Sequence, residues 1–181
     1  MTIKQFVKSK IFRCIIVLLC IALVSGGLLA IMNDLLNVSE EERVMRTVKK
    51  IYGKEVAYSV VDASYSDEKG KIDAVYLLED GNYLIKATGN KGYKQGTITI
   101  WCVAAFSEGT FAGVRDVSVA GYEKQTLMSK FTSDVLKKFG GTDDNAVTIS
   151  GATFSATAAN NAVNTVLAYA RSTLAGGQEN D

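Results

Sequence analysis

The feature that most limits the folds open to this chain is an apolar stretch near its N-terminus. It extends from Cys14 to Met32 and contains no charged residue. A helix needs ~20 such residues to cross the hydrocarbon core of a membrane. Four basic residues and no acidic residue precede it: Lys4, Lys8, Lys10 and Arg13. Because basic flanks remain in the cytoplasm, we expect a single membrane-spanning anchor with the rest of the chain outside the cytoplasm.

Three other interpretations of this stretch are open. A cleaved signal peptide needs small residues at the last and third-last positions before the cut, and Ala30 preceded by Leu28 fits this rule poorly. A lipoprotein site at Cys20 needs a small residue just before it, where Leu19 stands. A buried core helix is seldom so uniformly apolar. We therefore favour an uncleaved signal-anchor.

The segment after the apolar stretch predicts an amphipathic linker helix over 39–52. Ser39 followed by Glu42 is the capping-box pattern that begins many helices. The apolar residues of this segment form one stripe at helical spacing: Val44, Val48, Ile51 and Tyr52. We expect this helix to connect the anchor to the soluble domain.

From Glu55 to Val119 the pattern changes to short alternating segments separated by glycine-containing turns. Alternation with period two is typical of strands, and five are expected, at 56–61, 72–78, 83–87, 97–105 and 112–119. Tight turns at Asp80-Gly81 and Glu108-Gly109 make the strands that they join antiparallel.

One side of the fourth expected strand is uniformly apolar and is predicted to face the core: Ile98, Ile100, Cys102 and Ala104. Trp101 is predicted on the opposite side of the sheet. There it could stack on a flavin, although partial burial under a helix is the commoner environment of a strand tryptophan.

Two further helices are expected in the C-terminal half. Apolar residues recur at every fourth position between Glu123 and Phe139, which predicts a helix ended by Gly140-Gly141. A short strand is expected at 146–149. The last helix begins at about Ser155, with an apolar face made of Ala159, Val163, Val166, Leu167, Ala170 and Leu174. The whole pattern predicts an α+β domain, an antiparallel sheet flanked by helices.

Composition removes several classes of function. The chain has no histidine, so it lacks the commonest metal ligand and the commonest general base. Its net charge is +1, from 20 basic and 19 acidic residues, and this balance predicts no nucleic-acid partner. The three cysteines, Cys14, Cys20 and Cys102, have no disulfide or metal-binding spacing, and we expect buried structural thiols.

The stretch Ser150-Gly151-Ala152-Thr153 leads into the last helix, where Ser155 is the expected N-cap residue. A helix start presents unpaired N–H groups and the positive end of the macrodipole, so it favours an anion such as phosphate. Thr153 places a hydroxyl beside that position. A simple strand-to-helix turn with a small-residue cap would have the same composition, so the stretch alone leaves both interpretations open.

Ser150-Gly151-Ala152-Thr153 resembles the flavin-attachment motif of the FMN-binding domain in the Rnf complex G subunit and in the sodium-translocating NADH:quinone reductase C subunit. The helix residues 158–163 and the N-terminal anchor add to the resemblance. In that family a flavin transferase joins FMN to the motif threonine through a phosphoester bond.

The resemblance implies that Thr153 is the attachment residue for covalent FMN. It implies that the phosphate pocket is shaped by Ser150, Gly151, Ala152, Phe154 and Ser155. The implied partners are a flavin transferase for maturation and other subunits of a membrane electron-transport complex. No catalytic residue and no metal ligand are expected in the domain itself.

Two positions depart from the family pattern. The family has an aspartate three residues before the motif serine, where this chain has Val147. The family's glycine-containing loop corresponds here to the stretch 123–128, in which only Glu123 and Leu127 match. These departures motivate an alternative to a flavoprotein that relays electrons, a flavin-free extracytoplasmic binding module on the same fold. A second alternative is a structural protein of the envelope, anchored by its N-terminus.

The expected organisation has five parts. They are a cytoplasmic N-terminus at 1–13, a transmembrane signal-anchor at 14–32, a linker helix at 33–54, an FMN-binding domain at 55–174 and a loose tail at 175–181. The expected location is the cell membrane, crossed once, with the soluble domain outside the cytoplasm.

Overall fold

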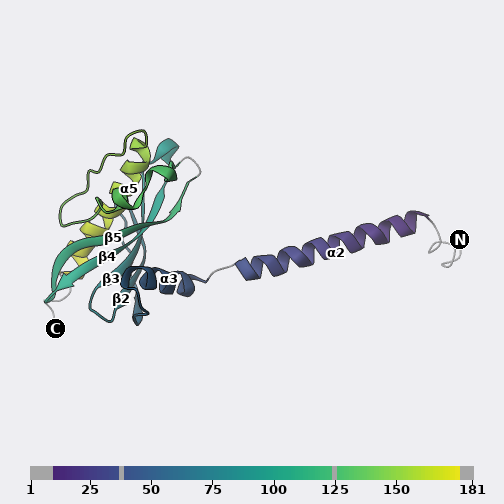
Figure 1. Cartoon of the computed structure of the whole chain (residues 1–181), viewed down its shortest axis with the longest axis horizontal. Helices are drawn as coiled ribbons and strands as arrows, with labels where there is room; N and C mark the ends of the chain where they lie inside the picture. The colour runs from purple at the N-terminus through teal and green to yellow at the C-terminus, as the bar shows by residue number, and fades with distance from the viewer. Residues whose placement is uncertain (1–9, 37–38, 124–125, 176–181) are drawn as a thin grey trace. The chain divides into compact units, whose positions relative to one another are not determined.

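The computed structural model describes residues 10–36, 39–123 and 126–175, and the chain divides into two compact units, 1–44 and 45–181. Helix α2 spans Lys10–Leu36 in the first unit (Figure 1). Its stretch Phe12–Met32 is long and apolar enough to cross a membrane, with a mean hydropathy of 2.9, and none of it is buried within the protein. The predicted apolar helix is therefore present. Most of the expected N-terminal segment and tail, 1–9 and 176–181, lies outside the described residues.

Helix α3 spans Glu40–Tyr52, close to the predicted linker helix. The backbone N–H of Glu42 donates to Ser39 Oγ at 3.2 Å, which is half of the predicted capping box. At the other end, Gly53 takes a φ of +69° and its N–H donates to the carbonyl of Lys49, which ends the helix. The sequence thus encodes both ends of this helix locally.

The second unit is built on a five-stranded antiparallel sheet in the simple order β1-β2-β3-β4-β5 (Figure 1). All five predicted strands are present, as β1 (Tyr58–Val61), β2 (Gly70–Leu78), β3 (Tyr83–Gly89), β4 (Ile98–Ser107) and β5 (Thr110–Tyr122). The two predicted tight turns join β2 to β3 and β4 to β5. In the second turn Glu108 and Gly109 both have positive φ, at 51° and 78°, which matches the twist of a two-residue hairpin.

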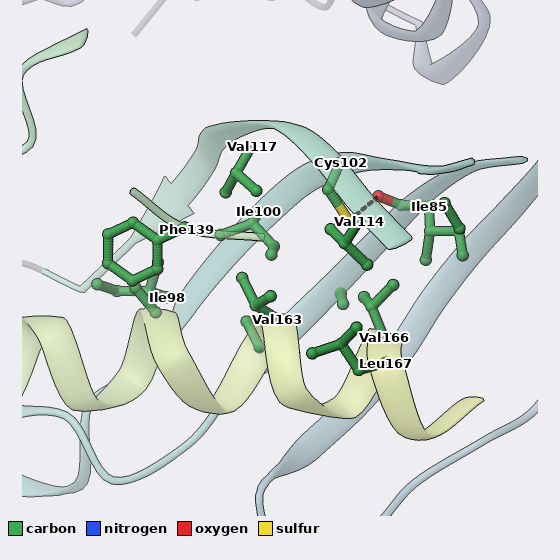
Figure 2. Close-up of a cluster of buried hydrophobic side chains, with 14 of the residues drawn as sticks. Ile85, Ile98, Ile100, Cys102, Val114, Val117, Phe139, Val163, Val166 and Leu167 are labelled. Atoms are coloured by element: carbon green, nitrogen blue, oxygen red, sulfur yellow. Dashed lines mark hydrogen bonds between the residues drawn. The ribbon is translucent and has the colours of Figure 1, made fainter. Parts of the chain in front are cut away.

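One face of the sheet is covered by helix α5, Thr153–Tyr169, which continues through the short π-helical segment η3, Ala170–Leu174. All six positions of the predicted apolar face of this helix are buried. Figure 2 shows Val163 and Leu167 of α5 facing the sheet residues Ile100 and Cys102, which belong to the same core cluster. The prediction that this side of β4 faces the core is confirmed.

The opposite face of the sheet carries Trp101, which is only 5% exposed. Its ring lies against that of Tyr76 at 6.0 Å, and Lys86 Nζ lies 5.5 Å from its centroid. Arg115 also belongs to this face, because it pairs with Val103 of β4. Its guanidinium lies 5.8 Å from the ring centroid of Tyr52, the last residue of α3.

The helix predicted over 123–139 does not form. The described part of this segment holds only two short turns, η2 (Met128–Lys130) and α4 (Ser133–Leu136). The rings of Phe131 and Phe139 still reach the core, where they stack 6.3 Å apart. Serine and threonine interrupt the segment and are weak helix formers, so core contacts made through turns outweigh the helical spacing.

The short strand predicted at 146–149 is also absent. Backbone groups at 145 and 147 bond instead to the side chains of Asn164 and Asn160 on α5. Because these amides satisfy the backbone as a neighbouring strand would, the segment is held against the helix and joins no sheet.

Candidate functional site

The N-cap of helix α5 lies three residues earlier than the sequence predicts. Ala152 is the N-cap residue and Thr153 the first helical residue, so the prediction of Ser155 as N-cap is wrong. The first intrahelical bond runs from the N–H of Ala156 to the carbonyl of Ala152, at 2.9 Å. The three N–H groups before it have no intrahelical partner, and no side chain of the residues that the structure describes caps them. The helix therefore opens with donors available to a ligand.

A cavity of about 350 Å³ lies at this helix start. It is lined by Tyr93, Leu127, Gly151, Ala152, Thr153, Phe154 and Ser155. None of these lining residues is charged, and Thr153 is both a lining residue and exposed to solvent. The volume falls within the range of ~300–1,000 Å³ typical of small-molecule sites.

One wall of the cavity comes from the loop between β3 and β4. Tyr93 lies in this loop, in the short turn η1 (Tyr93–Gln95), and its ring meets that of Phe154 edge to face at 5.7 Å. Three other residues of the loop are not glycine yet have positive φ: Lys91 at 69°, Lys94 at 49° and Gln95 at 63°. Such conformations cost on the order of 1 kcal/mol each and cluster at ligand-binding positions.

A second wall comes from the segment before η2. The backbone N–H of Leu127 donates to Ser155 Oγ at 3.3 Å. Ser155 is 4% exposed, so its hydroxyl lies inside the structure and does not cap the helix. The side chain predicted to cap the start of the helix therefore binds the backbone of a neighbouring loop.

The structure brings most of the predicted site residues together. Gly151, Ala152, Thr153, Phe154 and Ser155 line one cavity, whereas Ser150 lies in the exposed turn before it and does not line it. Trp101 is on the other face of the sheet from α5. Sequence reasoning did not place Tyr93 at the site, although the glycines that flank it in Lys91-Gly92-Tyr93-Lys94-Gln95-Gly96 mark a tight loop.

The arrangement fits a ligand that combines an anionic group with a flat ring. Open N–H groups and the helix dipole favour a phosphate next to the Thr153 hydroxyl. Phe154 and Tyr93 are 58% and 44% exposed, and both offer ring surface at the rim of the cavity. Among the residues that the structure describes, no group of His, Cys, Asp or Glu side chains is arranged to hold a metal ion.

Comparison with protein-family models, with curated proteins and with solved structures gives no match to this chain.

Proposed function

We propose that this chain is a membrane-anchored flavoprotein that carries FMN covalently on Thr153 and relays electrons outside the cytoplasm. It would act in a way similar to the G subunit of an Rnf-type complex. The observation that most supports this is the position of the motif threonine. Thr153 lies exposed at the opening of a cavity and beside the unpaired N–H groups of a long helix.

Each part of the cavity has a distinct task in this proposal. The N–H groups at 153–155 would hold the phosphate, and Gly151 leaves its side unobstructed because a Cβ there would meet nothing within 4 Å. Tyr93 and Phe154 would contact the ring system, and Leu127 would shield it from water. FMN, when bound, accepts and passes on electrons; the protein supplies position and electrostatics.

Helix α2 is the anchor in this proposal, and its support is that the stretch Phe12–Met32 is long and apolar enough to cross a membrane and is not buried within the protein. In the proposal this helix crosses the membrane once and keeps the flavin-bearing domain outside the cytoplasm, with the basic N-terminus inside. A covalent cofactor suits that location, because it is not lost by diffusion. The partners would be a flavin transferase and other subunits of a membrane electron-transport complex.

The test is to express the full chain together with a flavin transferase and to measure its intact mass and in-gel flavin fluorescence. We expect one FMN adduct, absent from Thr153→Ala and present in Thr157→Ala. Thr157 is the matched control, since it lies one turn further along the same helix and its hydroxyl donates to the carbonyl of Thr153. A wild-type chain without adduct would contradict the proposal, and an adduct in Thr153→Ala would contradict the assigned residue.

A flavin-free binding module is the second candidate, and the apolar rim of the cavity favours it. Leu127, Phe154 and Tyr93 are between 44% and 58% exposed, which is also typical of a surface that binds a partner. An absorbance spectrum of the chain purified from its native membrane separates the two candidates. Flavin absorbance supports the electron carrier, and its absence supports the binding module.

A further inference from the structure

Two asparagines of α5 hold the chain segment that leads to the Thr153 turn. Asn160 accepts from the N–H of Val147 at 3.0 Å and donates to its carbonyl at 2.9 Å. Asn164 does the same for Asn145, at 2.6 and 3.1 Å. Each amide therefore satisfies both backbone groups of one residue, as a partner strand would.

The spacing of these pairs fits the geometry of both chains. Four residues of helix advance about 6 Å, and two residues of extended chain advance about 6.6 Å. Asn160 and Asn164 are four apart, and Val147 and Asn145 are two apart. The segment therefore runs antiparallel to α5, with its register set by the two amides.

Asn160 is the amide nearer to the modification site along the segment. After Val147 the chain has one more buried anchor, Ile149, whose carbonyl accepts from the N–H of Ala152 at 2.9 Å. The turn between Ile149 and Ala152 is exposed at Ser150 and Gly151. Because this turn precedes Thr153 directly, its position depends on where Val147 and Ile149 are held.

We propose that Asn160 is a positioning residue for flavin attachment. Its side-chain amide fixes Val147, so that the turn at 149–152 presents the Thr153 hydroxyl in one orientation to the modifying enzyme. The inference rests on the proposed function and names a residue that acts on the same site through the backbone. The role does not require the aspartate that the flavin-binding family has at position 147. Asn160 binds the backbone of Val147 and not its side chain, so a valine can occupy this position.

The attachment reaction that Asn160 would serve is a phosphoryl transfer with FAD as donor. A bond forms between Thr153 Oγ and the phosphorus of the FMN half, and the phosphoanhydride bond of FAD breaks. AMP leaves, the hydroxyl proton goes to solvent, and no electrons are exchanged. Misplacement of a reacting group by about 1 Å can slow such a step on the order of a hundredfold.

The experiment compares Asn160→Ala with Asn164→Ala in the full chain, because both variants lose two hydrogen bonds to one backbone residue. We expect Asn160→Ala to slow flavin incorporation about tenfold or more and Asn164→Ala to slow it less than about threefold. The assay runs well below the thermal midpoint of either variant. Equal slowing in the two variants, or none in Asn160→Ala, would overturn the inference.

The exchange rates of the backbone amides provide a second measurement, which does not require flavin. Asn160→Ala is expected to speed exchange at Val147 and Ala152, while Asn164→Ala speeds it chiefly at Asn145. Unchanged exchange at Ala152 in Asn160→Ala would show that the turn is held without this amide. If the wild-type chain takes up no flavin, the proposed function fails, whereas the exchange data still decide whether Asn160 positions the turn.

Discussion

Among single residues, Cys102 has its chemistry changed most clearly by its position. It is fully buried in β4, and its thiol points to the carbonyl of Ile85 at 3.9 Å (Figure 2). Burial raises the pKa of the Cys102 thiol from 9.0 to about 12, because the thiolate would lose its hydration. The prediction of a buried structural thiol is confirmed for Cys102, whereas Cys14 and Cys20 are exposed on α2.

The raised pKa of Cys102 predicts how stability depends on pH. Above about pH 9 the unfolded chain releases the thiol proton while the folded chain keeps it, so alkali favours unfolding. We expect wild type to lose up to about 1.4 kcal/mol per pH unit relative to Cys102→Ala between pH 9 and 12. Urea unfolding of both proteins at several pH values measures this difference. Parallel pH profiles for the two proteins would contradict the prediction.

Among the elements, α5 organises the domain because it lies unusually close to the sheet. A Cβ built on Gly89 of β3 would lie 2.1 Å from the carbonyl oxygen of Ala158 and 2.3 Å from the N of Ala162. Both atoms belong to the helix backbone and cannot move aside by a rotamer change. The same helix lines the cavity with its first turn, so the distance between helix and sheet also sets where the cavity walls stand.

Gly89→Ala is therefore expected to be strongly destabilising, by about 3 kcal/mol or more, because the added methyl group must push α5 off the sheet. Gly121→Ala in β5 is the matched control. At Gly121 the atom nearest to an added Cβ would be the Cβ of Thr99, at 3.7 Å. We therefore expect the free energy of unfolding to change by no more than about 0.5 kcal/mol. Thermal unfolding of both variants measures the effect. Similar thermal unfolding midpoints for the two variants would show that the stability of the domain does not depend on the close contact between α5 and Gly89.

At the scale of the whole molecule, the exposed apolar surface of α2 is the feature that decides where the chain is located. None of the apolar window of α2 is buried within the protein, and the folded unit that follows has a core of its own. A chain with these two parts is expected to behave as an integral membrane protein, with a domain that folds independently of the bilayer.

Charges at the centre of α2 should abolish that behaviour. Leu18→Arg together with Leu23→Arg adds about 5–7 kcal/mol to the free energy of insertion, at ~2.5–3.5 kcal/mol for each arginine. The control carries valine at both positions. We expect wild type and control to stay in the membrane after alkaline extraction and the arginine variant to be released. Release of all three proteins would mean that α2 is not an anchor.

Much of the fold follows from local sequence signals. The apolar run of α2, the capping pattern at Ser39, the alternation in the strands and the helical face of α5 each specify an element within a few residues. The tight turns then fix the antiparallel order of neighbouring strands, because a short connection allows no other arrangement. These features were predictable because they depend on neighbours along the chain.

The remaining features depend on contacts between distant segments, which no local pattern contains. Phe131 and Phe139 have helical spacing, yet they reach the core through turns, and Ser155 bonds to Leu127 and does not cap its own helix. Tyr93 joins the cavity only because β3 and β4 carry its loop to the start of α5. The sequence alone determined the apolar N-terminal helix, the linker helix, the five strands, the last helix and the motif around Thr153. Tertiary structure alone decided the walls of the cavity, because packing energy outweighs the small local preferences of the segments that form them.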